Sequence, residues 1–106
     1  MASIKMNQQL FQELTSGSTP VLVDFSAPWC GYCRRIDPAY EILADQYEGR
    51  ILVAKVNIDD EPALAEQERI ELVPTLVLYQ NGKALGELVA PSSKAQIVEM
   101  VEGLLK

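Results

Sequence analysis

Runs of apolar residues along the chain predict four strands. Residues 20–26 and 51–58 are near-continuous apolar runs rich in β-branched side chains, as expected of strands covered on both faces. Residues 75–79 and 83–89 predict two further strands. They are joined at Asn81-Gly82, a pair that is the strongest short signal for a β-hairpin.

Elsewhere apolar residues recur every three or four positions, which predicts helices. Four are expected, over residues 7–17, 30–48, 59–69 and 93–105. Asn7 is expected to cap the first helix, and Ser93 with Gln96 forms a capping box for the last. Pro38 lies inside the second helix and should kink it.

These elements follow one another as helix, strand, helix, strand, helix, strand, strand, helix. The strand–helix–strand unit around residues 20–58 should form a parallel pair, and the hairpin adds antiparallel strands. We therefore predict an α/β fold with a mixed central sheet of four to five strands flanked by four α-helices. With 106 residues, the chain (residues 1–106) is expected to form a single domain.

The charge of the chain bears on its partners. It carries 15 acidic and 9 basic residues, a formal net charge of −6. Nucleic acid and anionic membranes are bound by clustered basic residues, so neither is an expected partner. There is no long apolar segment and no secretory signal pattern, so we expect a soluble, cytoplasmic protein.

The chain contains two cysteines, Cys30 and Cys33, and no histidine. Without histidine it has no Cys-His catalytic pair and no imidazole metal site, and two thiolates fall short of the four ligands of a zinc site. We therefore expect no bound metal and no bound cofactor.

The spacing of Cys30 and Cys33 indicates redox chemistry. At a helix start, Cys30 would lie among unpaired amides at the positive end of the helix dipole, which stabilises a thiolate. Cys30 is then the expected nucleophile and Cys33, one turn later, the resolving thiol, with a disulfide between them as the redox-active group. Two alternatives are a purely structural disulfide and half of a metal site completed by another chain or by glutathione.

One acidic residue, Asp24, interrupts the apolar run Val-Leu-Val-Asp-Phe. A buried carboxylate is costly unless it is satisfied, and burial should raise its pKa toward neutrality, as suits a general acid or base. The alternative is a position at the solvent-exposed edge of the strand.

Three separate motifs give the chain its resemblance to a known family. The stretch from Val23 to Cys33 (Val-Asp-Phe-Ser-Ala-Pro-Trp-Cys-Gly-Tyr-Cys), the triplet Val73-Pro74-Thr75 and the pair Asn81-Gly82 resemble the active-site signature, the cis-proline loop and the following hairpin of the thioredoxins. The similarity extends from about Asn7 to the C-terminus. It implies the thioredoxin fold, reduction of disulfides in target proteins, re-reduction by a thioredoxin reductase, and a monomer.

The resemblance also implies roles for individual residues. Asp24 would exchange a proton with Cys33 through water, with Lys55 as its basic neighbour. Pro74 would be cis, although the sequence alone favours a trans-proline at a strand start. Trp29, for which a core position is the alternative, would lie at the rim of the docking surface. The residues expected to form that substrate-binding docking surface are Trp29, Gly31, Tyr32, Val73, Pro74, Thr75 and Ala90.

The chain departs from the family pattern at three places. Gly31-Tyr32 replaces the usual Gly-Pro between the cysteines, which should make the couple less reducing. Ser26 replaces an aromatic residue, and Ala90-Pro91 stands where a glycine is usual. Tyrosine next to the second cysteine is reminiscent of glutaredoxins, so a glutathione-linked enzyme is one alternative. Others are an isomerase or oxidase, and a non-catalytic binding subunit with this fold.

Overall fold

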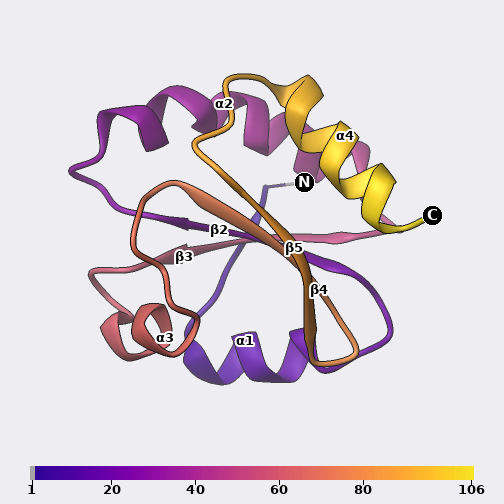
Figure 1. Cartoon of the computed structure of the whole chain (residues 1–106), viewed down its shortest axis with the longest axis horizontal. Helices are drawn as coiled ribbons and strands as arrows, with labels where there is room; N and C mark the ends of the chain where they lie inside the picture. The colour runs from indigo at the N-terminus through magenta and orange to yellow at the C-terminus, as the bar shows by residue number, and fades with distance from the viewer. Residues whose placement is uncertain (1) are drawn as a thin grey trace.

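The computed structural model describes residues 2–106 and shows one five-stranded sheet between two pairs of helices (Figure 1). The strands lie in the order β1-β3-β2-β4-β5. β2 is parallel to β3, which is parallel to β1, whereas β4 is antiparallel to both β2 and β5. Their bounds are β1 Ile4–Lys5, β2 Val21–Ser26, β3 Leu52–Asn57, β4 Thr75–Gln80 and β5 Lys83–Val89.

Two large apolar clusters lie one on each face of the sheet, and a third, small cluster surrounds the two cysteines. Helices α2 and α4 cover one face, and α1 and α3 cover the other (Figure 1). Every residue of β2 from Val21 to Phe25 is buried, because both faces of this central strand are covered. The helices are α1 Gln8–Thr15, α2 Gly31–Gln46, α3 Pro62–Gln67 and α4 Lys94–Leu104.

The predicted thioredoxin fold is confirmed, and its sheet has five strands, the higher of the two numbers predicted. The added strand is β1, which pairs with β3 through two residues. Asn7 caps α1 by accepting the Leu10 amide at 2.9 Å, as predicted. Ser93 accepts the Gln96 amide at 3.3 Å, but the Gln96 side chain accepts from the Ser92 amide, so the capping box is shifted by one residue.

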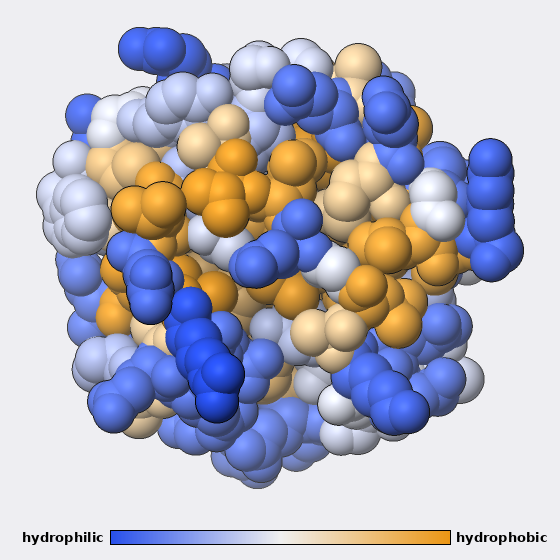
Figure 2. Space-filling model, viewed as in Figure 1, coloured by the Kyte–Doolittle hydropathy of each residue, from blue (hydrophilic) through white to orange (hydrophobic). Residues whose placement is uncertain are grey.

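The hairpin between β4 and β5 has the predicted turn. Asn81 and Gly82 have φ angles of 54° and 79°, the left-handed conformation that a two-residue turn of this type requires. β5 is an edge strand, and each of its residues is exposed or only partly buried. Figure 2 shows apolar residues gathered over the middle of the face turned to the viewer, interrupted by a few hydrophilic residues and surrounded by others.

The topology brings several loops to one end of the sheet. The loop after β2 leads into α2, and the parallel strand β3 ends beside it. β4 begins and β5 ends at this same end, because both run antiparallel to the strand next to them. The cysteine segment therefore lies near the loops before β4 and after β5.

Candidate active site

Cys30 is the N-cap residue of α2. Its Sγ accepts a hydrogen bond from the Cys33 amide at 3.1 Å, so a cysteine takes the place of the usual Ser, Thr, Asp or Asn cap. The Cys30 thiol donates to the Val73 carbonyl at an S–O distance of 3.7 Å. Both cysteines are free, so the structure shows the reduced form of the pair.

Cys33 lies in the first turn of α2, behind Cys30. It is 5% exposed, against 9% for Cys30. Burial, followed by the hydrogen bond with the Cys30 side chain, raises the pKa of the Cys33 thiol to about 12. The Cys33 thiol therefore stays protonated at neutral pH until a neighbouring group takes its proton.

Asp24 is buried in the centre of β2 and is 1% exposed, which excludes the edge position left open by the sequence. Neither carboxylate oxygen finds a hydrogen-bond partner within residues 2–106. Burial raises the pKa of Asp24 from 3.8 to about 7, as predicted, and the charges of Asp37 and Glu41 add to this while Lys55 opposes it. The carboxyl group can therefore bind or release a proton near neutral pH.

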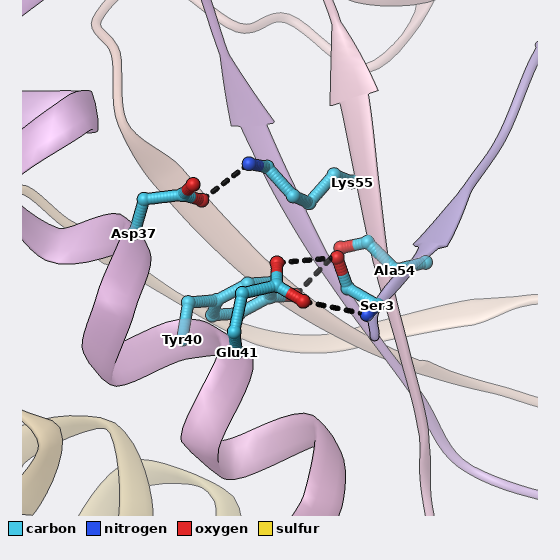
Figure 3. A network of polar contacts seen from close by, with 6 residues as sticks. All are labelled: Ser3, Asp37, Tyr40, Glu41, Ala54 and Lys55. Carbon is cyan, nitrogen blue, oxygen red and sulfur yellow. Dashed lines mark hydrogen bonds and ion pairs between the residues drawn. The ribbon is translucent and has the colours of Figure 1, made fainter. Parts of the chain in front are cut away.

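Lys55 lies opposite Asp24 in the register of β2 and β3. Its ammonium group, however, forms an ion pair with Asp37 on α2, as Figure 3 shows. On the next turn of the helix, Glu41 accepts hydrogen bonds from the amide and the hydroxyl of Ser3, both at 2.7 Å (Figure 3). The family resemblance named Lys55 but gave no indication of Asp37.

The sequence does hold a signal for these acids. Cys33, Asp37 and Glu41 are spaced four residues apart, which places them on one face of a helix. All three line a cavity of about 480 Å³ behind the cysteines, together with Lys55 and Ser26. Ser26 is the residue that replaces an aromatic side chain of the family pattern, and its small side chain leaves room at this wall.

The exposed part of the site lies around Cys30. Trp29 is 65% exposed and its indole N–H donates to Asp59 at 3.2 Å, so it is not a core residue. The Val73-Pro74 peptide bond is cis, as the family resemblance implied. The Pro74 carbonyl accepts the Ala90 amide at 2.8 Å, which joins the loop before β4 to the loop after β5.

The remaining residues of the expected docking surface differ in exposure. Gly31 and Ala90 are exposed, and Tyr32 is half-buried. Thr75 is 3% exposed and its hydroxyl donates to the Leu72 carbonyl at 2.5 Å. Its side chain therefore supports the loop before β4 from inside, and the place of Thr75 in the docking surface stays a prediction.

Neither a metal centre nor a membrane segment is found in the described part of the chain. Within residues 2–106, no group of three or more His, Cys, Asp or Glu side chains is placed to hold a metal ion. No helix in the same range is long and apolar enough to cross a membrane.

Comparison with known proteins places this geometry in a family. A family model named Thioredoxin matches residues 2–103. Thioredoxin 1 of Nostoc sp. is 42% identical over 91 residues, covering 86% of this chain and 85% of the relative. Thioredoxin of Alicyclobacillus acidocaldarius is 34% identical over 105 residues, covering 99% of this chain and all of the relative.

A third relative comes from a plant. The chloroplastic M-type thioredoxin of Pisum sativum is 42% identical over 98 residues, covering 92% of this chain and 57% of the relative. The family match extends over nearly the whole chain and includes the two cysteines, the buried aspartate and the cis-proline loop. It favours neither the glutaredoxin-like alternative nor the non-catalytic one. The chain belongs to the thioredoxin family and is a thiol–disulfide oxidoreductase that reduces protein disulfides.

Proposed function

We propose that Cys30 is the nucleophile and Cys33 the resolving thiol of this reductase. The supporting observation is the asymmetry of the pair: the Cys30 sulfur accepts an amide hydrogen bond at a helix start, whereas the Cys33 thiol is buried. An N–H donor and the helix dipole both stabilise a thiolate at Cys30.

The reaction transfers two electrons from the dithiol to the target. The Cys30 thiolate attacks one sulfur of the target disulfide, and the other target sulfur leaves as a thiolate and takes up a proton. Cys33 then loses its proton and attacks the Cys30 sulfur. The second target sulfur is released, and the Cys30–Cys33 disulfide forms.

Asp24 is the proposed acceptor of the Cys33 proton. Its negative charge contributes to raising the pKa of the Cys33 thiol, so the two groups are electrostatically coupled. A carboxyl group with a pKa of about 7 can take a proton from a buried thiol and return it to solvent at neutral pH. Lys55 acts in this scheme through its charge, since its hydrogen bond is to Asp37.

The proposed docking surface surrounds Cys30. An extended target segment would add to the edge of the loop before β4, with the backbone of Val73 as its hydrogen-bonding partner. Pro74 would shape this edge. Trp29, Gly31, Tyr32 and Ala90 would contact the flanking residues of the target, and Thr75 would support the loop.

The cellular setting is likewise proposed from family membership. Electrons would come from a thioredoxin reductase, and the partners would be disulfide-containing proteins. We propose a cytoplasmic monomer that carries electrons with no bound cofactor other than its own cysteine pair.

Two cysteine variants test the assignment of roles. Cys33→Ser should trap a covalent mixed disulfide with a protein target through Cys30, because the resolving step is removed. Cys30→Ser, which makes the same change three residues away, should form no adduct and should not turn over with a thioredoxin reductase. Mass spectrometry of the adducts reads out both variants. An adduct through Cys33 in the Cys30→Ser protein would reverse the proposed roles.

A further inference from the structure

Three segments around Cys30 are joined to one another by hydrogen bonds. At the start of α2, the Cys30 thiol donates to the Val73 carbonyl in the loop before β4, at 3.7 Å. The next residue of that loop, Pro74, accepts the Ala90 amide from the loop after β5, at 2.8 Å. The backbone that would receive a target segment is thus connected on both sides.

Tyr32 closes this ring of contacts. Its hydroxyl lies 3.2 Å from the Ala90 carbonyl oxygen and 3.1 Å from the Pro91 carbonyl oxygen. Both distances are longer than the usual O–H to O distance, as expected when one proton is shared between two acceptors. The Arg35 guanidinium lies over the Tyr32 ring, 5.7 Å from its centroid, a second contact to this side chain.

The loop that Tyr32 reaches has an unusual backbone. Ala90 has a φ of 48°, in the left-handed region that favours glycine. A residue other than glycine holds this conformation where the surrounding contacts fix it. Here the Ala90 amide and carbonyl are both held, one by Pro74 and the other by Tyr32.

We propose that Tyr32 is a specificity-determining residue, whose hydroxyl holds the loop after β5 against the start of α2 and so fixes the docking surface for extended protein targets. This proposal rests on the proposed function of the docking surface. A protein target contacts Val73 and Ala90 as well as Cys30. It therefore binds more tightly when these groups are already held in one arrangement, because less conformational entropy is lost on binding. A small disulfide contacts little beyond the Cys30 sulfur, so its binding depends much less on how the loop is held.

The test compares Tyr32→Phe with the wild-type protein on two substrates. One is a protein with a reducible disulfide, and the other is a small aromatic disulfide such as dithiobis(nitrobenzoic acid). Removing one neutral hydrogen bond should lower kcat/KM for the protein substrate by roughly three- to tenfold. The ratio of kcat/KM for the protein to that for the small disulfide should fall by nearly the same factor.

A matched control is available away from the site. The Tyr47 hydroxyl lies 2.9 Å from Glu102 on α4, so Tyr47→Phe also removes one tyrosine hydrogen bond. This variant should leave the substrate ratio at the wild-type value. A separate readout is amide hydrogen exchange at Ala90, which should become several-fold faster in Tyr32→Phe and stay unchanged in Tyr47→Phe.

The outcomes separate the two proposals. A wild-type protein that reduces neither substrate would overturn the proposed function, and the specificity role with it. An active wild-type protein with an unchanged ratio in Tyr32→Phe would overturn the specificity role alone. Equal losses on both substrates, with unchanged exchange at Ala90, would show that Tyr32 acts on the cysteines and not through the loop.

Discussion

The buried carboxylate of Asp24 should make the stability of the protein depend on pH. Its pKa is about 7 in the folded chain, against an ordinary value of 3.8 that applies when the chain unfolds. Between these two values the folded state holds a proton that the unfolded state has lost. The free energy of unfolding therefore falls as the pH rises from about 4 to about 7, and stays low above that.

The magnitude follows from the difference between the two pKa values. Since one pKa unit corresponds to about 1.4 kcal/mol, the full effect is about 4 kcal/mol, of which about 2.5 kcal/mol lies between pH 5 and pH 8. Asp24→Asn keeps the shape of the side chain and removes the titration. The variant should gain stability relative to the wild-type protein by that amount over this pH range.

The assay is unfolding in guanidinium chloride, followed by circular dichroism with a phosphine reductant present at each pH. Subtracting the free energy of unfolding of one protein from that of the other cancels the contributions of the other carboxylates. An unpaired amide at position 24 adds an offset to this difference that does not change with pH. Asp60→Asn makes the same change at an exposed carboxylate and should follow the wild-type profile. A stability difference between Asp24→Asn and wild type that is the same at pH 5 and pH 8 would refute the reasoning.

Two further predictions concern the neighbours of the reactive groups. Asp37→Asn removes a charge that raises the pKa of Asp24 and frees Lys55 from its ion pair, so the pKa of Asp24 should fall. The stability difference between Asp37→Asn and its double variant with Asp24→Asn should then level off at a lower pH than the difference between the wild-type protein and Asp24→Asn. Levelling at the same or a higher pH would contradict this. Tyr32→Pro restores the dipeptide usual in the family and should make the couple more reducing by tens of millivolts, where 30 mV corresponds to about 1.4 kcal/mol. Equilibration against glutathione buffers measures this change, and an equal or higher potential would contradict it.

Much of the fold could be predicted because it depends on local patterns. The runs at 20–26 and 51–58 mark strands buried on both faces, and Asn81-Gly82 fits a turn that needs two left-handed residues. β1 was missed because two residues carry no periodic signal, and the strand exists only through pairing with β3. The predicted C-terminal helix ends were one or two residues too late, because the residues after the caps of α2 and α3, Glu48 and Arg69, donate to carbonyls three residues back and not four.

The residues of the candidate site that could be predicted are those whose chemistry is conspicuous at their own position in the sequence. Cys30 and Cys33 lie one turn apart at the start of one helix, and Asp24 stands out in an apolar strand. The partner of Lys55 was not predictable, because the ion pair with Asp37 depends on how α2 packs on the sheet. The hydrogen bonds of Tyr32 join residues 58 and 59 positions apart, which no local pattern indicates.

The use of a cysteine as the cap of α2 links the stability of the fold to the direction of electron flow. In the reduced form the Cys30 sulfur receives the Cys33 amide and holds the first turn of the helix. In the disulfide the same sulfur is a poorer acceptor, so the cap is weakened on oxidation. Each 1.4 kcal/mol by which the cap favours the reduced form raises the reduction potential by about 30 mV. A stronger hydrogen bond from the Cys33 amide to the Cys30 sulfur thus makes the protein a weaker reductant. Substitutions at residues 31 and 32 that change the strength of this bond would therefore change the reduction potential.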